Sequence, residues 1–268
     1  ANDLDRVIVE VYQKDKGVLY SMKKVLVTGA SGYIGRSICS VFVADGWQVG
    51  GIDLLDAPDI CCTSKKCDLT DFIATQEAID IIAKELEGID SVICCAGQMI
   101  DDDGSIEVVT SEVMTKTLLV NVLGTFNAIN ASLPYLRDSS FPSIIVVGSL
   151  VASLGSASSE LAYTTSKGAV EAMVKELAVS LAYANIRVNC VSPGPLSGGL
   201  FLTNPDSLGE KKRLARIPLG RRGTCDEVAY ACNFLVSEYA SYITGAILMI
   251  DGGASAAFLA QLPQNADD

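Results

Sequence analysis

The sequence contains no histidine, and this absence excludes whole classes of active site. Ser-His-Asp and Cys-His hydrolases need an imidazole as their base, so neither mechanism is available to this chain. The nine cysteines include neighbours at 61, 62 and 67 and at 94 and 95, but no pair of CxxC units. We therefore expect no zinc or other metal site, and we assign most of the thiols to core packing.

Basic residues are also few, because 20 lysines and arginines stand against 32 acids and leave a net charge of −12. Nucleic acids and anionic membrane surfaces both bind basic faces, so we expect neither as a partner. Residues 139 to 159 carry no charge, but serine, glycine and proline interrupt them. That stretch predicts a strand and a loop rather than a transmembrane helix.

The length of 268 residues and the hydrophobic content of 49% predict one α/β domain with a large core. We expect this domain over residues 23 to 256, an N-terminal extension of uncertain origin over 1 to 22, and a tail over 257 to 268. The cysteine number is odd and no secretory signal is recognisable, which favours a reducing compartment, the cytoplasm.

Residues 23 to 53 predict a β-α-β unit made of the strand KKVLVTG, the turn TGASGYIG, a helix and the strand WQVGGID. Glycines at 29, 32 and 35 allow a tight turn, so a pyrophosphate can lie on the amino end of the helix. Asp53 ends the second strand, where a carboxylate holds the adenosine ribose hydroxyls and repels a 2′-phosphate. This pattern predicts NAD rather than NADP, with Arg36 turned to solvent.

The rest of the chain alternates between short β-branched runs and helical periods. We expect further strands near 65 to 68, 90 to 97, 144 to 147, 186 to 195 and 243 to 253. We expect helices that begin at an Asp71 cap, cover about 110 to 137, follow Tyr163 and cover 226 to 237. About seven strands alternating with helices predict a doubly wound parallel sheet with helices on both faces.

The centre of the chain places Ser149 after a buried strand, and Tyr163 and Lys167 four residues apart at the start of a helix. A tyrosine is a weak acid with a reference pKa of about 10. A cation ~5 Å away at an effective dielectric of ~20 favours the phenolate by about 3 kcal/mol. The spacing therefore predicts proton transfer by Tyr163, with Ser149 holding a substrate oxygen. A surface tyrosine and lysine on an ordinary helix remain the alternative.

In order along the chain, these residues resemble the short-chain dehydrogenase/reductase family from about residue 23 to 253. The resemblance rests on TGASGYIG, Asp68, Ala96-Gly97, Asn121, Ser149, YTTSK, Pro193-Gly194, PLGRRGTCDEVA and YITGAILMIDGG. It implies catalysis by Asn121, Ser149, Tyr163 and Lys167. It implies cofactor binding by Gly29, Ser31, Gly32, Tyr33, Ile34, Gly35, Asp53, Asp68, Leu69, Ala96, Gly97, Tyr163, Lys167, Pro193, Gly194, Leu196 and Ser197.

Two features depart from the single-domain branch of this family. The glycine turn has the G-x-x-G-x-x-G spacing of the epimerase-like branch, and Cys94-Cys95 replaces the usual Asn-Asn before Ala96-Gly97. The first departure predicts a slightly different phosphate cradle, and the second a loss of polar ties between neighbouring strands.

Together these features predict an NAD(H)-dependent oxidoreductase that interconverts a secondary alcohol and a ketone. The alternatives are an NAD-dependent epimerase or dehydratase and a catalytically silent NAD-binding scaffold. A polar segment that runs to about residue 224 predicts a lid, in which Leu200, Phe201 and Leu202 favour an apolar or cyclic substrate or pack against the core. The resemblance also implies a homotetramer or homodimer built on the helices at 110 to 137 and 160 to 185.

Overall fold

The computed structural model describes residues 22–56, 59, 61–156, 159–198 and 208–257. The expected N-terminal extension therefore lies outside the described residues, except for Met22. Most of the expected tail and the apolar group Leu200, Phe201 and Leu202 lie outside them as well. Within the described part, no helix has both the length and the apolar character needed to cross a membrane.

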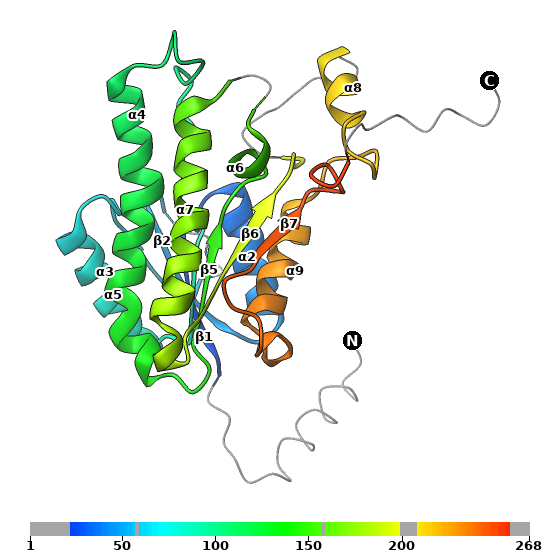
Figure 1. The fold of residues 1–268 in the computed structure, drawn as a ribbon. Coiled ribbons are helices and arrows are strands. Elements are labelled where there is room, and N and C mark those ends of the chain that lie inside the picture. The colour runs from blue at the N-terminus through cyan, green and yellow to red at the C-terminus, as the bar shows by residue number, and fades with distance from the viewer. Residues whose placement is uncertain (1–21, 57–58, 60, 157–158, 199–207, 258–268) are drawn as a thin grey trace.

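Seven parallel strands form one sheet in the order β3-β2-β1-β4-β5-β6-β7 (Figure 1). The order reverses direction between β1 and β4, and in such sheets the crevice at that reversal is the usual place for a ligand. This sheet confirms the predicted architecture. Its strands are β1 (Lys24–Thr28), β2 (Gln48–Asp53), β3 (Thr63–Lys66), β4 (Ser91–Cys94), β5 (Ser143–Val147), β6 (Arg187–Pro193) and β7 (Ile247–Ile250).

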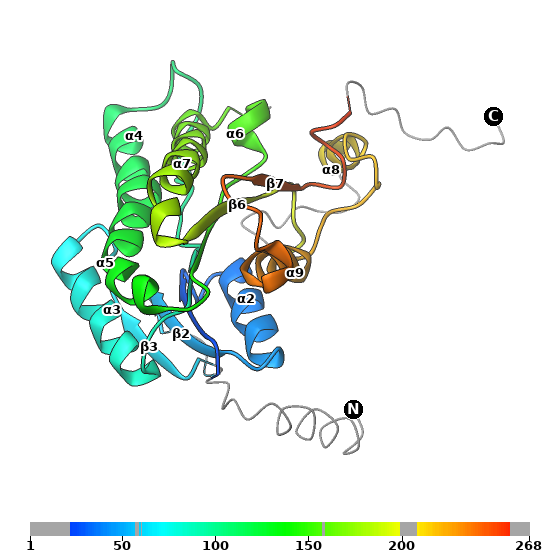
Figure 2. The ribbon, with the colours of Figure 1, turned by 60° about the horizontal axis from the view of Figure 1, so that its bottom comes forward.

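Helices cover both faces of the sheet (Figure 2). On one face Leu26 packs in a core with side chains of α3 (Phe72–Leu86), α5 (Gly124–Asp138) and α7 (Leu161–Ser180). On the other face, Val25 and Val27 pack with side chains of α2 (Tyr33–Ala44) and α9 (Cys225–Val236). Successive residues of one strand thus enter opposite cores, because strand side chains alternate between the two faces of a sheet.

The third strand ends earlier than the sequence predicts. β3 stops at Lys66, which pairs with Asp53, the last residue of β2. A strand cannot continue its ladder beyond the end of its only neighbour, so Cys67 and Asp68 leave the sheet. The predicted cap at Asp71 is confirmed, because its Oδ1 accepts a hydrogen bond from the backbone N–H of Ala74 at 3.0 Å.

The helix predicted over 110 to 137 is one helical run with an irregular middle. It consists of α4 (Ser111–Leu118), the π-helical turn η1 (Leu119–Leu123) and α5. The Gly124 N–H bonds back to the Leu119 carbonyl, five residues earlier, instead of four. Single π turns inside α-helices occur often at functional sites, and this one carries Asn121.

Candidate active site

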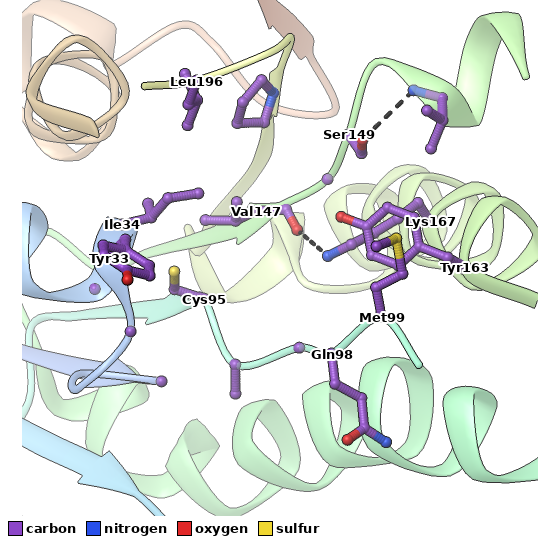
Figure 3. A pocket seen from close by; sticks show the side chains of 18 of the residues that line it. Tyr33, Ile34, Cys95, Gln98, Met99, Val147, Ser149, Tyr163, Lys167 and Leu196 are labelled. Atoms are coloured by element: carbon purple, nitrogen blue, oxygen red, sulfur yellow. Dashed lines mark hydrogen bonds between the residues drawn. The ribbon is translucent and has the colours of Figure 1, made fainter. Parts of the chain in front are cut away.

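A cleft of about 1260 Å³ opens at the carboxyl ends of the central strands. Residues that follow β1, β2, β4, β5 and β6 line it, together with the first turns of α2 and α7. Figure 3 shows this arrangement from close by, with side chains from separate strands directed into one space. Its volume exceeds the ~300–1,000 Å³ typical of small-molecule pockets, so it has room for a dinucleotide and a substrate.

The turn after β1 depends on the absence of side chains. Gly29 has φ +68, and a Cβ there would lie 2.7 Å from the Ala96 backbone. A Cβ on Gly35 would lie 2.0 Å from the Gly29 carbonyl oxygen. The turn therefore packs backbone against backbone and leaves the amino end of α2 open to the cleft, where Tyr33 and Ile34 line the wall. The free N–H groups of a first helical turn favour an anion, so this cradle fits a pyrophosphate.

Asp53 is held rigidly at the end of β2. Its Oδ2 accepts a hydrogen bond from the Ser31 N–H at 2.9 Å, and its Oδ1 accepts one from the Leu55 N–H at 3.1 Å. The carboxylate lines the cleft beside the glycine turn. Arg36 is exposed, does not line the cleft, and donates from Nε to the Ser31 carbonyl at 2.8 Å. The predicted orientations of both residues therefore agree with the structure.

Tyr163 and Lys167 lie one turn apart on α7, as their spacing predicts. The Lys167 side chain is buried, and its Nζ lies 5.6 Å from the centroid of the Tyr163 ring. That Nζ also donates to the Val147 carbonyl at 2.9 Å, which ties α7 to the end of β5. Figure 3 shows Ser149 facing the same opening as the Tyr163 ring. A cation, a phenol and a hydroxyl thus meet where a substrate oxygen can reach them.

Asn121 lies behind the cleft rather than in its wall. Its amide nitrogen donates to the Gln98 carbonyl and to the Ser166 hydroxyl, both at 2.9 Å, and its Oδ1 accepts from the Gln98 N–H at 2.8 Å. The Ser166 hydroxyl in turn donates to the Tyr163 carbonyl at 2.7 Å. Asn121 therefore links the loop after β4 to the helix that carries Tyr163.

The cysteine pair before Ala96 keeps its strand tied to the sheet by another route. The Ala96 N–H donates to the Thr28 hydroxyl on β1 at 3.2 Å, which supplies a polar tie that the sequence did not predict. Cys94 is buried in β4, whereas the Cys95 thiol points into the cleft (Figure 3). Burial raises the pKa of each of these thiols to about 12, so both are neutral near pH 7.

The structure brings nearly all of the predicted cofactor residues into the lining of one cleft, and Ser197 is the exception. Its N–H donates to the Gly223 carbonyl at 2.8 Å, so Ser197 joins the loop after β6 to the segment before α9. Ser149, Tyr163 and Lys167 line the cleft as well.

Two groups in or near the site were not predicted from the sequence. Asp103 accepts hydrogen bonds from the N–H groups of Ala162 at 2.9 Å and Tyr163 at 2.8 Å, and so caps α7 from a distant loop. The second group is the set of cations that line the cleft near α8 (Leu208–Leu214), namely Lys212, Arg213, Arg216 and Arg222. The basic run KKRLAR was a visible signal for the second group, whereas nothing local marks Asp103.

Comparison with known proteins agrees with this geometry. A family model described as Enoyl-(Acyl carrier protein) reductase matches residues 29–255. The L-fucose dehydrogenase of Bos taurus is 34% identical over 251 residues, which are 89% of this chain and 91% of that protein. A 3-oxoacyl-[acyl-carrier-protein] reductase of Thermotoga maritima is 33% identical over 247 residues, which are 86% of this chain and 97% of that protein.

A solved structure supports the same assignment. The ligand-free aldohexose dehydrogenase of Thermoplasma acidophilum superposes with a TM-score of 0.81 at 32% identity, over 91% of this chain and 98% of that one. The glycines of the first turn, strands β2 to β7 and the Tyr163–Lys167 pair all lie inside the residues that the family model matches. The chain therefore belongs to the short-chain dehydrogenase/reductase family and is an NAD(P)-dependent oxidoreductase that acts on an alcohol or its carbonyl partner.

Proposed function

We propose that this enzyme uses NAD(H) to interconvert a secondary alcohol and a ketone, with Tyr163 as the general acid and base. The supporting observation is that Tyr163, Lys167 and Ser149 share one cleft with Asp53 and the glycine turn. The glycine turn fits the pyrophosphate of a dinucleotide, and Asp53 fits its adenosine ribose. The other three residues supply a proton donor, a cation beside it and a hydroxyl that can hold the substrate oxygen.

In the direction of ketone reduction, a dinucleotide held by the glycine turn and Asp53 would supply the hydride for the carbonyl carbon. The Ser149 hydroxyl holds the carbonyl oxygen, and the Tyr163 hydroxyl donates a proton to it as its charge develops. The Lys167 ammonium, 5.6 Å from the ring centroid, stabilises the phenolate that remains. Asn121 fixes the position of the loop after β4 relative to the first turn of α7 through its hydrogen bonds with Gln98 and Ser166.

Replacement of Tyr163 by phenylalanine tests this chemistry. The ring and its packing remain, so NADH binding is expected to persist, whereas turnover is expected to fall by about 10²–10⁴-fold. Wild type and variant would be compared on a panel of secondary alcohols and ketones. A variant with full activity would contradict the role of Tyr163 and favour a different proton donor.

The preference for NAD over NADP rests on Asp53. Both oxygens of its carboxylate are fixed by backbone N–H groups, so the charge cannot swing away from a 2′-phosphate. Titration with NADH and with NADPH, read from the fluorescence of the bound nucleotide, is expected to show NADH binding at least about tenfold tighter. Trp47 is a poor reporter, because it precedes β2 at the end of the strand remote from Asp53. Equal or tighter NADPH binding would contradict the assignment.

We also propose that the chain forms a homodimer or homotetramer through the helical run α4–η1–α5. Leu119, Leu123 and Phe126 are large apolar residues on this run whose side chains are exposed in the single chain. Their spacing places them along one face of a helix, which is the pattern of an unpartnered interface. Leu123→Glu is expected to lower the mass measured by light scattering, whereas Ile106→Glu, at another exposed apolar residue, is expected to leave it unchanged.

A reducing compartment such as the cytoplasm completes the proposal. All nine cysteines are free thiols, including Cys39 and Cys61, whose sulfur atoms lie 3.7 Å apart, and reduced thiols fit such a compartment. Fluorescent tagging and microscopy would locate the protein, and a secreted protein would contradict this part of the proposal.

A further inference from the structure

Two cations in and just after helix α8 line the cleft without a partner of their own. Lys212 and Arg216 are exposed, both line the cleft, and neither side chain makes a hydrogen bond or ion pair with any residue that the structure describes. Lys212 lies within α8, and Arg216 lies in the turn that follows it, where its N–H bonds to the Arg213 carbonyl. Two positive charges without an acidic partner therefore line this part of the cleft.

The neighbouring cations Arg213 and Arg222 differ, because both contact one buried acid, Glu210. Glu210 is only 4% exposed, and Arg222 grips it with two bonds, Nε to Oε1 at 2.6 Å and Nη2 to Oε2 at 2.7 Å. Arg213 approaches the same carboxylate at 3.5 Å. Arg222 also donates to the Leu196 carbonyl at 2.9 Å, which anchors α8 to the loop after β6. The helix is thus held in place, and Lys212 and Arg216 are the cations in and after α8 that line the cleft without a partner among the described residues.

Apolar side chains from several elements line the same cleft as these cations and Tyr163. Met99 comes from the loop after β4, Val151 and Leu154 from α6 (Val151–Leu154), and Ile217 from the segment after α8. Figure 1 shows α6 and α8 at the same end of the sheet, above the tips of the strands. A molecule that reaches from Tyr163 to Lys212 and Arg216 would therefore contact apolar side chains, with Glu160 as an acidic residue in the same lining.

The charged residues that line the cleft are unevenly distributed. Asp53 and Asp68 lie beside the glycine turn, Lys116 is on α4 and Glu160 precedes α7, whereas four cations line the cleft in and after α8, in a chain whose net charge is −12. Unpaired cations beside low-dielectric walls attract an anion and raise its local concentration. An arginine and a lysine that line the same part of a cleft match a carboxylate or a phosphate.

We propose that Lys212 and Arg216 bind the anionic group of the substrate, so that the enzyme acts on a small carbonyl compound bearing a carboxylate or a phosphate. This inference rests on the proposed reaction at Tyr163 and names its substrate class. The anionic group lies at the α8 end, and a short apolar chain spans the distance to the reacting carbonyl.

Matched pairs of ketones that differ in charge test the proposal. Pyruvate, 4-oxopentanoate and 5-oxohexanoate would each be compared with the methyl ester, and dihydroxyacetone phosphate with dihydroxyacetone. Binding to the NADH complex is read from nucleotide fluorescence, and turnover from loss of NADH absorbance. We expect at least one anion to bind about tenfold or more tightly than its neutral partner. Preference for the keto acids would identify the bound group as a carboxylate, and preference for dihydroxyacetone phosphate would identify it as a phosphate.

Two variants locate the effect on the helix. Lys212→Ala/Arg216→Ala is expected to abolish the preference for the anion and to leave NADH affinity within about twofold of wild type. Lys211→Ala is the matched control, because Lys211 is an exposed cation on the same helix that does not line the cleft. This control is expected to retain the preference.

The outcomes separate this inference from the proposed reaction. If no anion binds better than its neutral partner, or if the double variant weakens NADH as much as it weakens the anions, the proposed anion site is wrong. Reduction of the neutral ketones without any charge preference would preserve the oxidoreductase function and overturn the anion site. Selective binding that depends on Lys212 and Arg216, with no turnover of any ketone, would preserve the site and contradict the reaction.

Discussion

The two ends of the cleft are built in different ways. The end beside β1, β2 and α2 depends on close backbone packing, with Gly29 pressed against the Ala96 main chain after β4 and Gly35 against the Gly29 carbonyl. The end beside α7 and α8 is assembled from side chains distant in sequence, such as Asp103 with Tyr163 and Glu210 with Arg222. A side chain added at either glycine of the first end would collide with backbone, whereas the side-chain contacts of the second end can be replaced.

We infer from this difference that the backbone end serves the cofactor, which all members of the family share, and that the side-chain end serves the particular substrate. A backbone cradle recognises a pyrophosphate by its charge and shape, whatever side chains surround it. Side chains on α6 and α8 can change without disturbing the sheet, because they lie beyond the ends of the strands. Substitutions at the first end are therefore expected to damage folding and cofactor binding together, and those at the second end to change catalysis or selectivity alone.

The largest expected effect is that of Gly35→Ala. The new Cβ would lie 2.0 Å from the Gly29 carbonyl oxygen, so the turn must open. We expect a loss of about 3 kcal/mol in the free energy of unfolding and a loss of NADH binding of about a hundredfold or more. Thermal unfolding and nucleotide titration measure the two effects.

Gly168→Ala is the control for that substitution. It places a Cβ within α7 where no atom lies within 4 Å, and so is expected to keep NADH binding and to raise stability by up to about 1 kcal/mol. Normal NADH binding by Gly35→Ala would contradict the statement that the glycine turn cannot accommodate a side chain at this position.

Asp53→Asn tests whether a side chain at the glycine-turn end of the cleft determines the preference for NADH over NADPH. The amide removes the charge that repels a 2′-phosphate but keeps one acceptor for the Ser31 or Leu55 N–H. We expect the NADH to NADPH affinity ratio to fall about tenfold, with little change in thermal stability. An unchanged ratio would place the discrimination elsewhere in the cleft.

Asp103→Ala tests the substrate end, where a distant cap positions the helix that carries Tyr163. Loss of the cap is expected to cost about 1 kcal/mol of stability and, by displacing Tyr163, about tenfold in kcat, with a shifted pH profile. Asp71→Ala removes a comparable cap from α3, remote from the reacting groups, and is expected to cost similar stability while leaving kcat unchanged. Equal kcat losses in both variants would indicate a purely structural role for Asp103.

The smallest effects concern thiol chemistry. Burial raises the pKa of Cys95 to about 12, so its reactive thiolate is scarce at neutral pH and grows only as the pH rises towards that value. At pH 9 roughly one thiol in a thousand would be ionised. Iodoacetamide followed by mass spectrometry is expected to label the exposed Cys62 well before Cys95. Rapid labelling of Cys95 would show that the loop after β4 opens readily.

Much of this molecule could be predicted because its signals are local. Strand and helix periods, the Asp71 cap, the glycine turn and the spacing of Tyr163 and Lys167 each involve residues within a few turns of one another. The end of β3 could not be placed, because the length of its neighbour β2 decides where its pairing stops. The π turn at Asn121 was hidden for the same reason, since the partners of that side chain are Gln98 and Ser166.

The sequence by itself determined the order of the strands and helices, the glycine cradle and the residues available for proton transfer, because backbone sterics and helical spacing act over short distances. Tertiary structure alone decided that Asp103 caps the turn of Tyr163, that Asn121 lies behind the wall of the cleft, and that Glu210 neutralises Arg222 but leaves Lys212 and Arg216 facing the cleft. These contacts join segments that meet only when the sheet and its helices have assembled. Local propensity does not encode which distant partner a side chain will contact.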